Sequence, residues 1–144
     1  MSKGRKKKRI GGLRRHNEMV MRRVYKRVAR REQGYRCFYC FCPLSLAGTT
    51  ADHLVPLIDR GRTVYENIKA ACARCNMAKG VMHWQAFLDQ ITQPATRLDG
   101  VIAEIAWDRW MWRITWASCE RICAGVGIDA APVLIGITAE GIAR

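Results

Sequence analysis

The chain has 144 residues, which suffice for one modest domain with an extension but hardly for two full domains. Its formal net charge is +13, with most of the excess before Cys37, so the composition predicts attraction to a polyanion such as nucleic acid. No apolar run reaches membrane-spanning length, and no apolar segment of a signal peptide follows the basic N-terminus. We therefore expect a cytoplasmic protein in a reducing compartment, with no membrane partner, where paired cysteines favour metal over disulfides.

Two segments precede the first cysteine. Residues 1–16 are mostly Lys, Arg and Gly, so we expect a disordered basic arm. Residues 17–34 form a predicted basic amphipathic helix, with Asn17 as its N-cap, Gly34 just past its end, and Val20, Val24 and Val28 on one apolar face. The other face is expected to meet nucleic-acid phosphates through Arg22, Arg23, Lys26, Arg27 and Arg30.

The segment from Cys37 to Gly80 organises the chain. Cys37 and Cys40 form one Cys-x-x-Cys pair, and Cys72 and Cys75 form a second. Four thiolates at this spacing can hold one tetrahedral structural Zn²⁺. Cys42 is then a spare, expected as a small buried thiol, with substitution for Cys40 as the alternative.

Secondary structure inside this segment follows a simple order. Thr49 to Leu54 is rich in β-branched residues and precedes a proline, which indicates a short strand that ends near Asp52 and His53. A loop over 56–63 leads to a second predicted strand over 68–71. Asn76 is expected to open a helix whose apolar positions continue to Ile91. The predicted order is strand, loop, strand, helix.

These motifs together resemble the HNH nuclease family. They are the two Cys-x-x-Cys pairs, Ala-Asp-His-Leu-Val-Pro, Glu-Asn-Ile, and Cys-Asn-Met-Ala-Lys-Gly in order. The resemblance is to the branch whose ββα-metal finger (His-Me finger) is braced by four cysteines, as in stand-alone nucleases of phages. It implies an α+β fold with the finger over residues 35–92, flanked by the basic helix and by a Trp-rich helical extension over 93–144.

The resemblance also implies roles for single residues. His53 matches the general base, and a neutral imidazole suits that task near pH 7. Asp52 and Asn76 match the ligands of a catalytic metal, and their oxygen donors favour Mg²⁺ or Mn²⁺. Asn67 matches a central asparagine that braces the loop after the histidine. Weaker candidates for phosphate contact are Arg60, Arg62, Arg74 and Lys79.

The C-terminal part is read from its pattern alone. Residues 93–100 are expected to form a linker, and 101–124 a helix that carries four of the five tryptophans. Packing on the finger or on the N-terminal helix is the first interpretation of these tryptophans, with a dimer contact or a base-stacking surface as alternatives. Cys119 and Cys123 are expected to pack in the core.

The resulting hypothesis is a metal-dependent HNH endonuclease that hydrolyses DNA phosphodiester bonds, nicking one strand or cutting both as a dimer. A catalytically silent zinc module that binds nucleic acid and a ribonuclease are the alternatives. Asp52, His53, Asn67 and Asn76 argue against the silent module, because binding alone does not require them. The expected partner is DNA, while a homodimer and association with phage-packaging or mobile-element proteins stay open.

Overall fold

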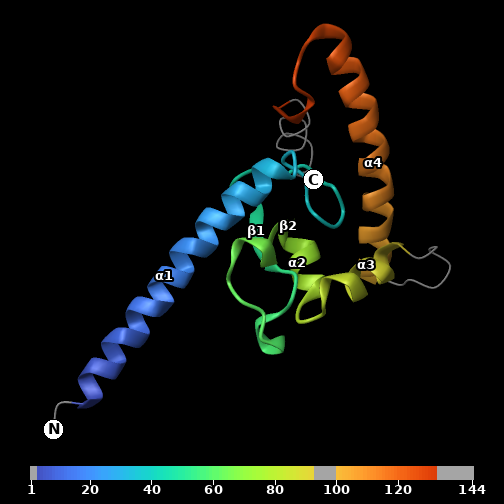
Figure 1. Ribbon diagram of the computed structural model, residues 1–144. Helices are drawn as coiled ribbons and strands as arrows, with labels where there is room; N and C mark the ends of the chain where they lie inside the picture. Colours follow the sequence, from blue (N-terminus) through green and yellow to red (C-terminus); the bar gives the residue numbers. More distant parts are fainter. Residues whose placement is uncertain (1–2, 93–99, 133–144) are drawn as a thin grey trace.

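The computed structural model describes residues 3–92 and 100–132 (Figure 1). Its elements are α1 (Lys3–Glu32), β1 (Thr49–His53), β2 (Ile68–Cys72), α2 (Ala73–Lys79), α3 (Trp84–Thr92) and α4 (Gly100–Val126), with short 3₁₀ turns at Leu57–Asp59 and Tyr65–Asn67. The fold is a mixture of helices and one small antiparallel sheet. Within the described ranges, no helix has both the length and the hydropathy needed to cross a bilayer.

The sheet and α2 form the centre of the molecule. β1 and β2 pair antiparallel, with Asp52 opposite Lys69 and His53 opposite Ile68. α2 follows β2 directly, so the order strand, loop, strand, helix agrees with the ββα finger expected from the sequence. Cys72 caps the N-terminus of α2, because its Sγ accepts a hydrogen bond from the Cys75 N–H at 3.4 Å.

The helix after the second cysteine pair is shorter than expected. A single helix from Asn76 to Ile91 was predicted, but α2 already starts at Ala73 and ends at Lys79. Gly80 then adopts a positive φ of 52°, a conformation that glycine reaches without steric cost. α3 is a separate helix, tied to the finger by the Trp84 N–H, which donates to the Leu54 carbonyl at 3.0 Å.

The N-terminal helix is longer than expected. α1 begins at Lys3, so residues 3–16 are helical and Asn17 lies inside the helix. Lys and Arg are good helix formers, and no proline interrupts the run, which explains the extension. The helix ends at Glu32, and Gly34 follows with a φ of 61°. Figure 1 shows α1 projecting well beyond the finger.

α1 contacts the finger through its basic face and not through the apolar face that was expected to be buried. Val20, Val24 and Val28 are 41%, 45% and 39% exposed. Instead Arg22 donates to the Ala51 carbonyl at 3.0 Å and Lys26 to the Thr49 carbonyl at 2.9 Å.

The reason lies in the sheet. Ala51 pairs with Ala70, whose N–H and C=O bond to Gln33 and Phe38 and not to β1. The Ala51 carbonyl therefore points away from β2, as does that of Thr49 two residues earlier. β1 is an edge strand, and its outward carbonyl groups need donors that valines cannot supply.

The core lies between the turn over residues 37–44, the sheet and the helices α3 and α4. Its buried members are Ala29, Cys37, Tyr39, Cys40, Leu44, Ala70, Ala71, Cys75, Phe87, Ile91 and Ile105. α4 packs against α3 and covers this side of the finger. The helix passes through Gly125 to Val126, and Gly127 follows with a φ of 70°.

The tryptophans of α4 are only partly covered. Trp116 is 2% exposed and donates to the Phe41 carbonyl at 2.7 Å, whereas Trp107 and Trp110 are 62% and 53% exposed. Core packing thus accounts for Trp116 but not for the exposed pair. The expected linker lies outside the described residues except for Gly100, which starts α4, and residues 133–144 also lie outside.

Candidate active site and metal centre

His53 is the last residue of β1 and is 8% exposed. Its Nε2 lies 3.1 Å from the Thr63 hydroxyl oxygen, across the loop that joins the strands. Burial first, and then the positive charge of Arg22, lower the pKa of His53 below its ordinary value. The imidazole is therefore neutral over a wider pH range, as a general base requires.

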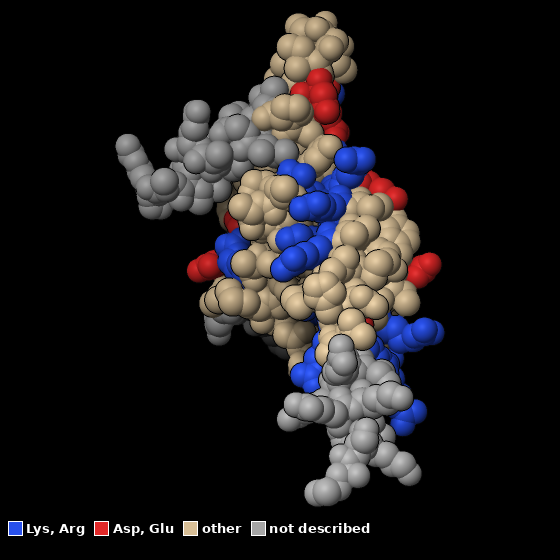
Figure 2. Space-filling model, turned by 90° about the vertical axis from the view of Figure 1, so that its left-hand side faces the viewer, with Lys and Arg blue, Asp and Glu red and all other residues tan. Residues whose placement is uncertain are grey.

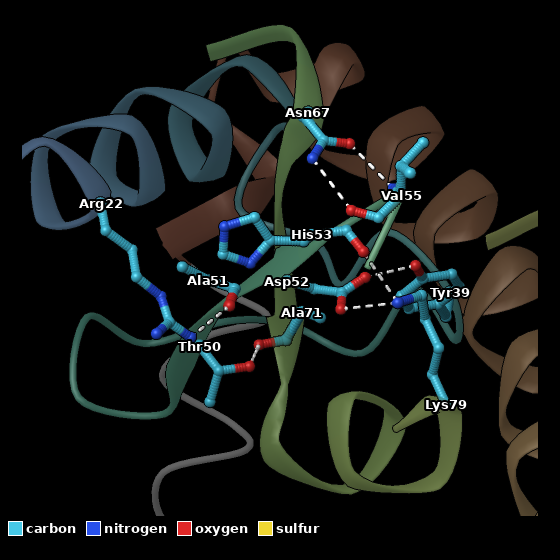
Figure 3. Close-up of polar contacts among 10 residues, drawn as sticks. All are labelled: Arg22, Tyr39, Thr50, Ala51, Asp52, His53, Val55, Asn67, Ala71 and Lys79. Atoms are coloured by element: carbon cyan, nitrogen blue, oxygen red, sulfur yellow. Dashed lines mark hydrogen bonds and ion pairs between the residues drawn. The ribbon is translucent and has the colours of Figure 1, made fainter. Parts of the chain in front are cut away.

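Asn67 fixes the backbone that follows His53. Its Oδ1 accepts a hydrogen bond from the Val55 N–H at 2.8 Å, and its Nδ2 donates to the Val55 carbonyl at 3.0 Å (Figure 3). The Nδ2 also donates to the Arg62 carbonyl at 2.9 Å. The backbone at Gly61 lies so close to Val55 that a Cβ at Gly61 would lie 1.9 Å from the Val55 carbonyl oxygen. The loop therefore needs glycine at this position. Asn67 thus holds both ends of the loop and is a bracing residue.

Asp52 points to the other side of β1 from His53, as alternation along a strand requires (Figure 3). Tyr39 donates to its Oδ2 at 2.5 Å, and the Lys79 ammonium donates to its Oδ1 at 3.0 Å. Lys79 also donates to the His53 carbonyl at 2.8 Å. Burial and the adjacent Asp52 charge raise the pKa of Tyr39 well above its usual range, so it stays a donor.

Lys79 corrects one prediction from the sequence. It was expected to contact phosphate, but it is 2% exposed and committed to Asp52 and the β1 backbone. A lysine buried at the end of α2 cannot reach DNA. The sequence analysis did not predict that Lys79 and Tyr39 donate to the Asp52 carboxylate. The one signal in the sequence was the position of Lys79, three residues after Asn76 and therefore close to the predicted metal ligands.

Three of the four predicted catalytic residues share one pocket. Asp52, His53 and Asn76 line a pocket of about 250 Å³, together with Arg22 of α1 and Lys79. Asn67 lies outside it, in keeping with a bracing role. The residues that line the pocket thus include an imidazole, a carboxylate and an amide, groups that can serve as a base and as metal ligands in phosphodiester hydrolysis.

The oxygen donors of this pocket fit a hard cation. The Asn76 side chain makes no hydrogen bond within the described part of the chain. Each Asp52 carboxylate oxygen accepts one hydrogen bond from a side chain and keeps a further acceptor site. Carboxylate and amide oxygens are the donors that Mg²⁺ and Mn²⁺ prefer.

The cysteines gather into a cluster at the base of the finger. The thiols of Cys37, Cys40, Cys42 and Cys72 all lie within 4.8 Å of one another. Cys75 is fully buried beside them, and its hydrogen bonding with the other thiols, first of all Cys37, raises its pKa. The cluster could hold a metal, and four thiolates fit tetrahedral zinc.

Cys42 differs from its expected role. Its thiol is one of the four that lie within 4.8 Å of one another, whereas the thiol of Cys75 is not. Cys42 is therefore part of the cluster and not a separate buried thiol. The local turn accounts for this: the Cys37 N–H donates to the Cys42 carbonyl at 2.8 Å and brings the two residues together. The structure therefore offers five thiols for four tetrahedral positions.

The remaining predicted phosphate contacts divide into two groups. Arg74 ion-pairs with Asp108 and lies 3.9 Å from Glu104, so it joins α2 to α4. Arg30 donates to the Leu44 carbonyl at 2.7 Å. The predicted phosphate contacts that stay exposed and make no ion pair in the described structure are Arg22, Arg23, Arg27, Arg60 and Arg62, of which Arg22 also donates to the Ala51 carbonyl. Figure 2 shows Lys and Arg gathered in a stripe on the side where α1 lies.

Comparison with known proteins identifies the finger. Residues 37–81 match the family model described as HNH endonuclease, so this part of the chain is an HNH endonuclease domain. A stretch of 49 residues, 33% of the chain, is 41% identical to the CRISPR-associated endonuclease Cas9 of Corynebacterium diphtheriae. The chain covers 4% of that protein. No solved structure matches the chain significantly. The family match supports endonuclease activity in general for this domain.

Proposed function

We propose that the chain is a metal-dependent endonuclease that hydrolyses phosphodiester bonds of DNA, with His53 as the general base. One observation carries the proposal: His53, with its lowered pKa, lines the same pocket as Asp52 and Asn76. All three residues lie inside the segment that matches the HNH endonuclease family. A merely structural zinc module would not need this convergence of groups.

His53 has the surroundings of a base. Its ring lies on the opposite side of β1 from the Asp52 carboxylate, so it is not tied up in an ion pair (Figure 3). Thr63 contacts one ring nitrogen, and Asn67 fixes the following backbone, which limits rotation of the ring. The neutral imidazole takes a proton from the attacking water as the water approaches phosphorus.

Asp52 and Asn76 would hold the catalytic Mg²⁺ or Mn²⁺. When bound, such an ion stabilises negative charge on the reacting phosphate and on the leaving oxygen. Lys79 and Tyr39 hold the Asp52 carboxylate in place through one hydrogen bond to each of its oxygens. Zn²⁺ on the cysteine cluster would serve structure alone, because four thiolates leave no open position for substrate.

DNA is the proposed substrate, and exposed cations on the helix that reaches the pocket are available to bind its phosphates. Arg23 and Arg27 lie on α1, the same helix that brings Arg22 to the pocket. Such contacts neutralise phosphates without reading bases. One pocket serves one strand, so a single chain is expected to nick, and cleavage of both strands would require a second copy.

The test is a nicking assay on supercoiled plasmid with added Mg²⁺. Wild-type protein should convert the plasmid to the open circle, and His53→Ala should abolish conversion while DNA binding stays nearly unchanged. His83→Ala is the matched control, since His83 lies outside the pocket. Equal cleavage by His53→Ala and wild-type protein would show that the assigned base is wrong.

A further inference from the structure

The pocket around His53 is completed by a residue outside the HNH domain. The family match covers residues 37–81, whereas α1 ends at Glu32. Arg22 of α1 nevertheless lines the pocket together with His53 and Asn76. Figure 3 shows the Arg22 side chain reaching toward β1 on the side where the His53 ring lies.

Arg22 is held in this place by a ladder of contacts. Arg22, Lys26 and Arg30 recur every four residues and donate to the carbonyls of Ala51, Thr49 and Leu44. Residues at this spacing share one helix face, so the ladder fixes the rotation of α1 on the edge of β1. Ala29, 3% exposed in the core, anchors the same part of the helix.

The ladder leaves Arg22 with unused donors. Its Nη2 donates to the Ala51 carbonyl, and the guanidinium has five N–H groups in total. Arg22 makes no ion pair with an acidic residue in the part of the chain that the structure describes. The nearest pocket carboxylate, Asp52, is already paired with Lys79. The pocket therefore presents an uncompensated guanidinium, and a phosphate matches its planar donor fork.

We propose that Arg22 is a catalytic residue that binds the oxygens of the scissile phosphate, which makes α1 an integral part of the active site. This inference rests on the proposed nuclease function. Arg22 contacts the phosphate from the α1 side, while His53 activates water from the end of β1. Its positive charge stabilises the additional negative charge that develops on the phosphate oxygens in the transition state. No atom of Arg22 is transferred in the reaction.

The experiment compares Arg22→Ala with variants that share its other properties. Arg31→Ala removes the same charge from α1 at an exposed position half a turn around the helix. Lys26→Ala removes the adjacent rung of the ladder. Single-turnover cleavage is measured at DNA concentrations that saturate each variant, so that loss of binding does not enter the rate.

Arg22→Ala is expected to lose about 10²–10³-fold in the single-turnover rate, as for removal of one preorganised donor to a developing oxyanion. Arg22→Lys should recover part of the rate, and Arg31→Ala should keep it. Lys26→Ala should lose much less than Arg22→Ala. An equal loss for Lys26→Ala and Arg22→Ala would overturn the proposal, because Arg22 would then act only as an anchor.

Two further outcomes separate this inference from the function on which it rests. If wild-type protein cleaves and Arg22→Ala cleaves equally fast at saturation, Arg22 is not catalytic and the nuclease function stands. If wild-type protein cleaves no faster than His53→Ala, the proposed function fails and the role of Arg22 fails with it.

Discussion

Lys79→Met is expected to destabilise the protein strongly, because it leaves the Asp52 carboxylate buried without its cation. The two side chains are 1% and 4% exposed, and their charged atoms are 3.0 Å apart. Removing one partner of such a buried pair typically costs about 3–5 kcal/mol of unfolding free energy. A domain is commonly stable by only about 5–15 kcal/mol, so this loss is a large part of the total.

The assay is urea denaturation of zinc-loaded protein, followed by tryptophan fluorescence. Lys69→Met is the matched control: Lys69 stands opposite Asp52 in the sheet but is half-buried and makes no ion pair among the described residues. Its replacement should change the free energy of unfolding by no more than about 1 kcal/mol, as for a surface charge.

The double variant Asp52→Asn with Lys79→Met tests the cause. It removes both charges, so most of the lost stability should return. The reasoning is refuted if Lys79→Met loses less than about 1 kcal/mol, the range of an exposed pair. It is also refuted if the double variant is as unstable as Lys79→Met, because the unpaired charge would then not be the cause.

Other predictions concern the loop, the pH profile and the two metals. Asn67→Ala removes three hydrogen bonds to the loop backbone; it should cost about 1–3 kcal/mol in urea denaturation and slow cleavage. The single-turnover rate should rise with pH through a midpoint below the ordinary His pKa of 6.5, because lowering the pKa of His53 extends the neutral form to lower pH; a midpoint above that value would contradict the base assignment. Elemental analysis should find about one zinc per chain in wild-type protein. Cys72→Ser should lose the zinc and unfold the finger. Cys42→Ser should retain the zinc and the folded finger, with Cys75 as the fourth ligand. A mild chelator should abolish cleavage, and Mg²⁺ should restore it without a change in circular dichroism; full activity of metal-free Asp52→Ala protein would refute the metal dependence.

The finger could be predicted from the sequence because its signals are local. Thr49–His53 and Ile68–Cys72 form the two strands within one residue of the expected ends, since β-branched residues and a following proline mark the first. The approach of Asp52 and Asn76 to one pocket follows from the fixed geometry of strand, turn and helix.

The packing of α1 could not be predicted in this way. Apolar periodicity assigns Val20, Val24 and Val28 to a buried face, but the rotation of a helix depends on the surface that it meets. That surface is the outer edge of β1, which presents not apolar side chains for the valines to cover but carbonyl groups that need hydrogen-bond donors. The same limit hid the burial of Lys79, whose partner lies 27 residues earlier in the chain.

The cysteine cluster and the pocket around His53 meet in α2, a helix of only seven residues. Cys72 caps its beginning, Cys75 lies in its first turn, Asn76 lines the pocket, and Lys79 at its end neutralises Asp52. Cys75 and Lys79 are four residues apart, so they lie one above the other on the same face of the helix. A displacement of Cys75, which is buried beside the cluster, would therefore move Lys79 and Asn76 with it. The positions of both the Asp52 carboxylate and the Asn76 amide in the pocket therefore depend on the cysteines that begin α2.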